Sequence, residues 1–360
     1  NVEYIEIDQM LKPFATPNDP RYDDQWHSYE QAGGLNLPTA WDTATGSGVV
    51  VAVLDTGYRP HIDLNANILP GYDMISNVSV ANDGGGRDSD ARDPGDAISA
   101  NECGYTHGAQ SSSWHGTHVA GTVAAVTNNG EGVAGVAYDA KVVPVRVLGK
   151  CGGLTSDIAD GIIWASGGSV SGVPANANPA DVINMSLGYI GGGCINAYQA
   201  VINDVFAQNI SIVSSSGNSG SSMPGAYGYP ASCENVISVG ATDIAGARAY
   251  YSTFNNMVDI AAPGGTTGTD LNGDGVGDGV PAFANDNSIQ AWQGTSMASP
   301  HVAASLAVLY AIAPDLTASQ MDGFITSGYL TDDVGLAGKD DEYGYGALNL
   351  IKGFSTLVSD

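Results

Sequence analysis

Short runs rich in β-branched residues recur along the chain, and helical patterns lie between them. Residues 49–54 read VVVAVL, and similar runs occupy 141–148, 181–185, 210–214 and 236–239. Helical patterns are expected over 118–126, 156–165, 197–208 and 299–311. Strands that alternate with helices predict an α/β fold with a mostly parallel sheet and helices on both faces. Ligand chemistry is then expected at the carboxyl ends of the strands.

The 360 residues are enough for one large domain, and we expect one. Stretches rich in Asp, Gly and Ser at 73–110, 166–179 and 264–287 are expected to be loops. The longest uncharged apolar stretches, 48–54 and 302–313, are shorter than the roughly 20 residues that span a bilayer, so we expect no membrane span. No basic stretch followed by an apolar core opens the sequence, so any signal peptide has been removed or lies outside it.

The composition is strongly acidic. Lys and Arg number 11 against 38 Asp and Glu, for a formal net charge of −27. Such a charge repels phosphate backbones and anionic membranes, so we expect neither nucleic acid nor a membrane as partner. A solvated acidic surface and cation binding both remain open as its role.

Four cysteines, Cys103, Cys151, Cys194 and Cys233, lie far apart in the sequence. Without C-x-x-C spacing they indicate neither a zinc site nor a redox pair, so disulfides are expected. Three pairings are possible. We favour Cys103 with Cys151 and Cys194 with Cys233, because each pair would tie a long loop to a neighbouring segment. Disulfides indicate an oxidising compartment.

Three polar segments fit amide hydrolysis, which needs a nucleophile, a base and a group that orients the base. Asp55 ends the first apolar run, HGTHVAG at 115–121 opens a helix, and GTSMASPH at 294–301 places Ser296 where a turn meets a helix. We expect His118 to be the base. Taken singly, an Asp at a strand end is commonly a turn residue, and a Ser before a helix is commonly an N-cap. His115 and His118 could also form a metal-binding pair, but the sequence lacks the H-E-x-x-H pattern that is typical of such a site.

These segments, VAVLDTG, HGTHVAGT and GTSMASPHVA, resemble the three active-site signatures of the subtilisin-like serine proteases, in that family's order. The resemblance extends from about residue 17 to residue 360. It implies that Ser296 attacks the peptide carbonyl, His118 transfers the proton and Asp55 orients the imidazole. The segment SSSGNSG resembles the one whose asparagine stabilises the oxyanion, which implies that role for Asn218 beside the backbone N–H of Ser296.

The same resemblance suggests where substrate binds. Ser186, Leu187 and Gly188 would form one edge of the groove, and Gly152 and Gly153 the opposite edge. Gly228 would leave the floor of the specificity pocket open, which predicts a large apolar or aromatic residue before the cut. The expected protein is a secreted, monomeric serine endopeptidase that cleaves protein or peptide substrates through an acyl-enzyme.

Calcium is the expected cofactor. The segments TPNDPRYDDQW, HIDL and AAVTNNGEGVAG resemble calcium-binding segments of thermitase-type members of the family. By that resemblance the ligands are Asp19, Asp63, the Asn129 side chain and the main-chain oxygens of Val126, Glu131 and Val133. Oxygen-only ligation suits Ca²⁺.

Two further acidic clusters are candidate calcium sites. One comprises Asp83, Asp88, Asp90, Asp93 and Asp96, and the other comprises Asp270, Asn272, Asp274 and Asp278. The second has the spacing that starts an EF-hand loop, but Pro281 stands where the bidentate Glu belongs. A solvated acidic loop remains the alternative for each.

Residues 1–14 differ in pattern from the rest and resemble the last strand of an inhibitory prosegment, which in this family aids folding. We expect them to be a prosegment remnant or a simple extension, with the peptidase domain over 15–360.

Two rival functions stay open. A lipase or esterase lacks its G-x-S-x-G motif here, and an inactive peptide-binding scaffold would have no need of all four catalytic groups.

Overall fold

The computed structural model describes residues 16–104, 107–220, 222–285 and 287–357. Within them, nine strands form one sheet in the order β12-β13-β9-β8-β6-β4-β1-β3-β2, and every neighbouring pair is parallel except β12 with β13. The strands are β1 Val50–Asp55, β2 Tyr72–Asp73, β3 Lys141–Arg146, β4 Val182–Met185, β6 Ser211–Ser215, β8 Ile237–Thr242, β9 Ile260–Pro263, β12 Thr331–Asp332 and β13 Ala347–Leu348.

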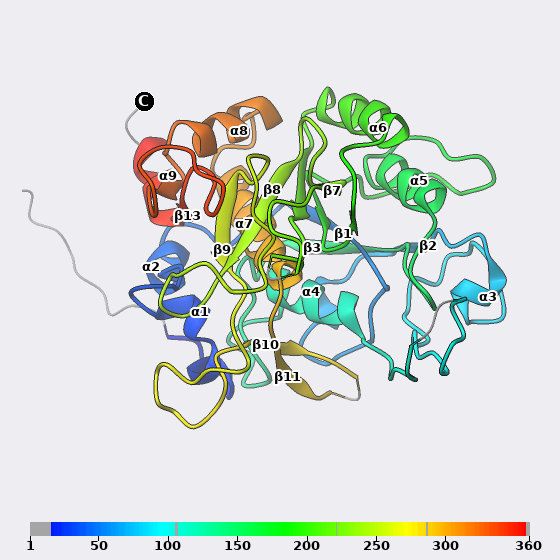
Figure 1. Cartoon of the computed structure of the whole chain (residues 1–360), viewed down its shortest axis with the longest axis horizontal. Helices are drawn as coiled ribbons and strands as arrows, with labels where there is room; N and C mark the ends of the chain where they lie inside the picture. Colours follow the sequence, from blue (N-terminus) through cyan, green and yellow to red (C-terminus); the bar gives the residue numbers. More distant parts are fainter. Residues whose placement is uncertain (1–15, 105–106, 221, 286, 358–360) are drawn as a thin grey trace, which may run out of the picture.

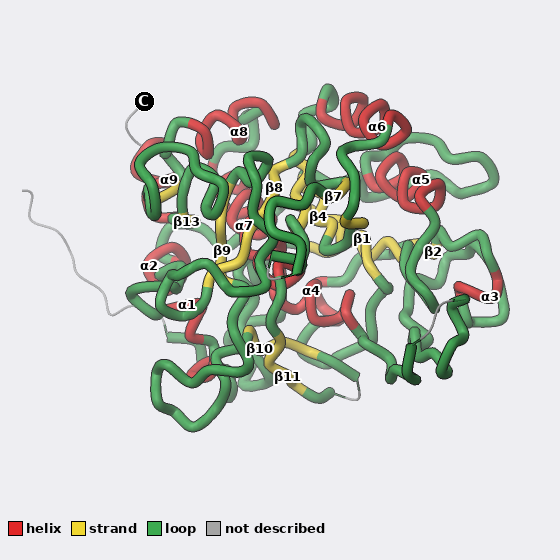
Figure 2. Tube along the Cα trace, in the orientation of Figure 1, coloured by secondary structure: helices red, strands yellow, loops and turns green. Residues whose placement is uncertain are grey.

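Helices cover both faces of the sheet, as Figures 1 and 2 show. On one face lie α4 (His115–Ala124) and α7 (Thr295–Ile312), and on the other lie α5 (Thr155–Ala165) and α6 (Asn196–Phe206). The short helices are α1 Trp26–Tyr29, α2 Leu37–Trp41, α3 Val78–Ala81, α8 Ala318–Thr326 and α9 Leu350–Leu357, with 3-10 turns at Tyr22–Asp24 and Asn65–Asn67. The predicted fold class is confirmed.

Strand β1 shows why such a strand reads as a continuous apolar run. Val51 and Val53 join the core under α4 and α7, whereas Ala52 and Leu54 join the core under α5 and α6. Successive side chains of a strand point to opposite faces, so a strand buried on both faces keeps no polar position.

Helix α7 is the central helix of the larger core. Its 18 residues have a mean hydropathy of 1.2, apolar enough to cross a membrane, but 83% of the stretch is buried inside the protein. The apolar character of α7 therefore serves protein packing.

Two small antiparallel sheets border the carboxyl ends of the main strands. Strand β5 (Tyr189–Ile190) pairs with β7 (Gly228–Tyr229), and β10 (Val280–Phe283) pairs with β11 (Ile289–Trp292). The expectation of loop over 264–287 is wrong for β10, whose four residues are all buried. Figure 1 shows the β10–β11 hairpin next to α4, which β10 contacts.

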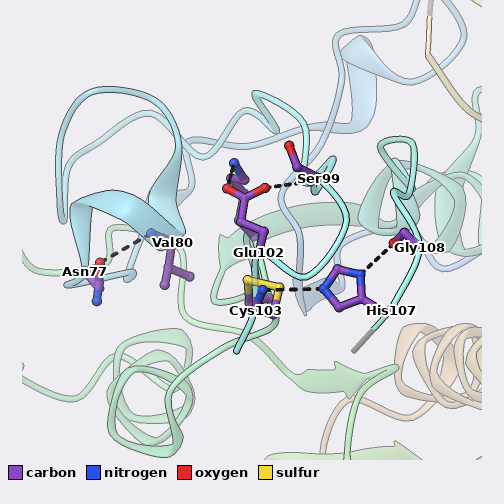
Figure 3. Close-up of a disulfide and its surroundings, with 9 residues drawn as sticks. Asn77, Val80, Ser99, Glu102, Cys103, His107 and Gly108 are labelled. Carbon is purple, nitrogen blue, oxygen red and sulfur yellow. Dashed lines mark hydrogen bonds and ion pairs between the residues drawn. A yellow bond between two sulfur atoms is a disulfide. The ribbon is translucent and has the colours of Figure 1, made fainter. Parts of the chain in front are cut away.

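Both favoured disulfides are confirmed. Cys103 bonds Cys151 across 48 residues, and Cys194 bonds Cys233 across 39 residues. Figure 3 shows the first disulfide in its loop, where the Cys103 N–H donates to Nε2 of His107 and the Ser99 N–H donates to Glu102. Residues 1–14, expected to be a prosegment remnant, lie outside the described residues.

Candidate active site

Asp55 lies at the carboxyl end of β1, fully buried. Its Oδ1 accepts a hydrogen bond of 2.7 Å from the Thr56 N–H. The amino end of α4 approaches closely enough for the Gly116 N–H to donate to Thr56 Oγ1 at 3.0 Å. A Cβ at Gly116 would lie 2.1 Å from the Gly57 oxygen, so only glycine permits this approach. The first residue of α4 is thereby held against Asp55.

That first residue is His115, and it is the histidine that contacts Asp55. Its Nδ1 lies 2.8 Å from Oδ1 and 2.9 Å from Oδ2 of Asp55. The His115 side chain is 24% exposed, so its other face reaches solvent. A carboxylate on Nδ1 fixes the tautomer that leaves Nε2 free as a base.

The structure overturns the expectation that His118 contacts Asp55. One turn further into α4, the His118 ring is fully buried, and its Nε2 faces the Val280 oxygen at 3.0 Å and the Gln290 oxygen at 3.2 Å. It stacks on Trp292 with ring centroids 4.4 Å apart, and burial lowers its pKa to about 3. His118 is therefore a neutral core residue that ties α4 to the β10–β11 hairpin.

The pKa of His115 shifts in the opposite direction to that of His118. Burial by itself lowers the pKa of His115, but the Asp55 carboxylate, helped by Asp96 and Asp93, raises it more, and the net shift is upward from 6.5. A raised pKa favours a base that can take up a proton and hold it as imidazolium.

Ser296 lies in the first turn of α7, which starts at Thr295 and not at residue 299 as expected. Its hydroxyl donates to the Ser186 oxygen at 3.3 Å, and the Ser186 hydroxyl donates to the Ser296 oxygen at 2.8 Å. Ser186 directly follows β4, next to β1 in the sheet. The serine is thus held at the same edge of the sheet as Asp55.

Asn218 follows β6 and faces the same helix end. Its Oδ1 accepts from both the Thr295 N–H at 2.9 Å and the Thr295 hydroxyl at 3.0 Å, which leaves Nδ2 as a donor toward the pocket. A Cβ built on Gly294 would lie 3.6 Å from Asn218 Nδ2 and 3.6 Å from the Ser296 nitrogen. The two nitrogens therefore lie near one another at the helix N-terminus, where an oxyanion would be stabilised.

Two cavities lie along this edge. One of about 590 Å³ is lined by His115, by Gly152 and Gly153, and by Ser186 to Tyr189. The other, of about 230 Å³, is lined by Ser296, Asn218 and Gly228, and again by Ser186 to Tyr189. All six residues expected to bind substrate therefore line one or the other of these two cavities, which share Ser186 to Tyr189; His115 lines the first cavity and Ser296 the second.

The structure does not show the open pocket floor that was expected at Gly228. A Cβ there would lie 2.7 Å from Ile190 Cδ1, so a neighbouring side chain fills the space that this glycine leaves.

The first predicted calcium site is partly assembled. Asp63 is fully buried and accepts from Asn129 Nδ2 at 2.6 Å and from the Val133 N–H at 3.0 Å. Asp19, 4% exposed, accepts from the Asn128 N–H at 2.9 Å and the Asn129 N–H at 3.4 Å. Burial, with the charges of Asp19 and Glu131, raises the pKa of Asp63 to about 7.

These two carboxylates form no ion pair with another described residue. At Gly132 (φ 48°), a Cβ would lie 2.1 Å from Asp63 Oδ2, so glycine lets the backbone wrap the carboxylate. The two carboxylates suit Ca²⁺. Asn129 turns Nδ2 toward Asp63 while its Oδ1 accepts from the Glu131 N–H at 2.9 Å, so ligation by this side chain requires its amide to turn over.

The other two acidic clusters are spread out. Across the described ranges, no three His, Cys, Asp or Glu side chains gather closely enough to hold a metal ion. Asp90 pairs with Arg92, Asp83 lies 3.4 Å from Arg146, and Asp96 accepts from Ser113. Asp88 and Asp93 accept from the N–H two residues on, at Asp90 and Gly95.

In the second cluster, Asp270 accepts from three successive N–H groups at 273–275, and Asn272 Nδ2 donates to Asp274 at 2.9 Å. Asp278 is 2% exposed and accepts from the Leu271 N–H, while its Oδ1 is buried without a hydrogen-bond partner among the described residues. Calcium binding by either cluster stays a prediction.

Known proteins resemble the chain over most of its length. It matches the subtilase family, Peptidase S8, over residues 46–346. An extracellular protease of Xanthomonas campestris pv. campestris is 56% identical over 314 residues, which cover 87% of this chain and 53% of that protein. Thermitase of Thermoactinomyces vulgaris is 32% identical over 290 residues, 80% of this chain and 83% of that protein.

A solved structure of a protease from Pseudoalteromonas arctica is 59% identical, with a TM-score of 0.87, over 95% of this chain and 99% of that one. The chain spans about half the length of the Xanthomonas protein and of an extracellular basic protease of Dichelobacter nodosus, 53% and 51% respectively. Because the family match covers more than half of the sequence, the chain belongs to the subtilase family.

Proposed function

We propose that this chain is a secreted serine endopeptidase with a triad of Asp55, His115 and Ser296. The observation that carries the proposal is the paired contact of His115 Nδ1 with the buried Asp55 carboxylate, at the sheet edge where Ser296 and Asn218 converge. Two disulfides and the names of two extracellular relatives support secretion.

The proposed chemistry uses these groups in sequence. Ser296 Oγ attacks the peptide carbonyl while His115 Nε2 takes its proton, and Asp55 stabilises the imidazolium. The Ser296 N–H and Asn218 Nδ2 hold the oxyanion. His115 then protonates the leaving amine, and water hydrolyses the acyl-enzyme by the same route.

The expected substrate is an extended protein segment in the groove between Gly152–Gly153 and Ser186–Gly188. None of the described residues that line the cavity beside Ser296 carries a charge, which supports an apolar residue before the cut. A large or aromatic preference, inhibition by a prosegment and a monomeric state remain predictions.

We also propose that Asp19, Asp63 and Asn129 hold Ca²⁺ together with the main-chain oxygens of Val126, Glu131 and Val133. The support is the pair of buried carboxylates without a cationic partner among the described residues, and the glycine that lets the backbone enclose Asp63. The ion would neutralise these charges and stabilise the N-terminal segment against the 126–133 loop.

Labelling with a fluorophosphonate, combined with release of peptides from denatured casein, tests the triad. We expect the label on Ser296 and loss of both label and turnover in Ser296→Ala, but not in Ser319→Ala, an exposed serine on α8. Proteolysis without a label on Ser296 would refute the nucleophile. Cleavage of activated esters without release of peptides would instead favour an esterase, and neither activity would favour a peptide-binding scaffold.

A further inference from the structure

The cavity beside Ser296 contains a side chain that no part of the proposed mechanism uses. Ile190, the last residue of β5, lines this cavity together with Gly217 and Gly228. Those two glycines come from segments that are not adjacent in the sequence, yet both face the same methyl group.

The position of that methyl is fixed by two close approaches. A Cβ on Gly217 would lie 2.5 Å from Ile190 Cδ1, and a Cβ on Gly228 would lie 2.7 Å from the same atom. Real Cβ atoms do not approach that closely, so Cδ1 fills the space that the two glycines would otherwise open. Ile190 Cδ1 therefore forms the wall of the cavity beside Gly217 and Gly228.

The wall that carries Ile190 is tied down on both sides. Ile190 pairs with Gly228 in the β5–β7 ladder, and the N–H groups of Gly191 and Gly192 continue that ladder by donating to the Tyr227 oxygen at 3.0 and 3.3 Å. A few residues further on, the Cys194–Cys233 disulfide joins the two segments covalently. The β-branched side chain is itself stiff at χ1. Gly217 and Gly228 both lie against Cδ1, so a longer ligand side chain would have to rotate this methyl against those two segments.

We propose that Ile190 sets the length of side chain accepted before the cut, so that the short γ-branched side chain of Leu is accepted better, and cleaved faster, than Phe and Tyr. This inference rests on the proposed peptidase function and replaces the aromatic part of its predicted preference. An aromatic ring reaches deeper than Leu and would meet Cδ1, whereas the shorter Leu side chain would end before it.

Ile190→Val tests this, because it removes only Cδ1 and keeps the β-branch. The assay is kcat/KM on peptide amides that differ only in having Leu or Phe before the cut. For wild type we expect Leu to exceed Phe by at least about 10-fold, since a misfit of even one methylene in an apolar pocket discriminates by roughly 10- to 200-fold. Ile190→Val should raise the Phe/Leu ratio about 10-fold, and Ile190→Ala should raise it further. Ile351→Val, at a half-buried isoleucine on α9, is the matched control and should leave the ratio unchanged.

A wild-type preference for Phe over Leu would overturn the inference, and this readout does not depend on whether any variant folds. An unchanged ratio in folded Ile190→Val, or a parallel loss on both substrates, would also overturn it. If wild type cleaved no peptide at all, the proposed function would fail, an outcome distinct from the failure of the specificity assignment.

Discussion

Replacing Asp63 by Asn should stabilise the calcium-free protein and remove its stabilisation by calcium. The pKa of Asp63 rises from 3.8 to about 7 in the folded chain without metal. Because the pKa of Asp63 is higher in the folded than in the unfolded chain, its protonated carboxyl contributes to folding stability. That contribution is full below about pH 4 and is lost as the pH rises through about 7. At pH 8 the ionised Asp63 then costs about 4 kcal/mol at most, and roughly 2 to 4 after discounting for solvent screening.

The corresponding change in melting temperature follows from the size of the chain. An unfolding entropy of about 2.1 cal/mol/K per residue gives about 0.75 kcal/mol/K for 360 residues. In excess chelator at pH 8, Asp63→Asn should therefore melt about 3 to 5 °C above the parent, and the gap should close near pH 4. In calcium at about 100 times its Kd, the parent gains about 2.7 kcal/mol that the variant lacks.

Thermal unfolding followed by circular dichroism measures this, in a Ser296→Ala background that prevents self-digestion. Asp204→Asn, an exposed position on α6, is the matched control and should behave like the parent. A variant that keeps the full calcium response would refute the assignment of Asp63 as a ligand. A calcium-free parent as stable as the variant at pH 8 would refute the cost of burying this charge.

Two further results are expected. Asn218→Ala should lower kcat by about 100- to 1,000-fold with little change in KM, a magnitude measured in subtilisin, a member of this family; a change confined to KM would contradict the oxyanion role. In acid, the unfolding free energy in urea should fall below pH 6.5, because burial lowers the pKa of His118 to about 3 and of His301 to about 4 while the unfolded histidines bind protons freely. His118 alone should contribute roughly 2 to 3 kcal/mol of this loss at pH 4.5, so His118→Gln should flatten the slope, and an unchanged slope would count against a neutral buried imidazole.

The central strands could be predicted closely because burial on both faces leaves an uninterrupted apolar run, as in β1. The first residues of the helices are harder to predict from the sequence. Helices α4 and α7 open with polar residues, His115 in α4 and Thr295 and Ser296 in α7, so the apolar periodicity begins only after them. Strand β10 was missed because four residues containing Pro281, inside a stretch rich in Gly and Asp, carry no clear period.

The same cause explains the choice of the wrong histidine. His115 and His118 lie one helical turn apart, and the sequence pattern does not say which turn meets the sheet edge. Gly116 was the available signal, because a glycine directly after a helix start allows a strand end to approach it. The filling of the Gly228 space by Ile190 depends on contacts between separate segments, and spacing along the chain carries no information about these.

The most direct test of the account is to compare His115→Ala with His118→Gln, a variant that keeps a side-chain donor toward the Val280 and Gln290 oxygens. The measurement is kcat on a peptide amide at pH 8, with circular dichroism to establish that both variants fold. The account predicts a loss of about a million-fold for His115→Ala, the size known for the catalytic histidine of subtilisin, and less than about 10-fold for His118→Gln. Full activity in His115→Ala, or an equally deep loss confined to His118→Gln, would contradict the assignment of His115 as the base.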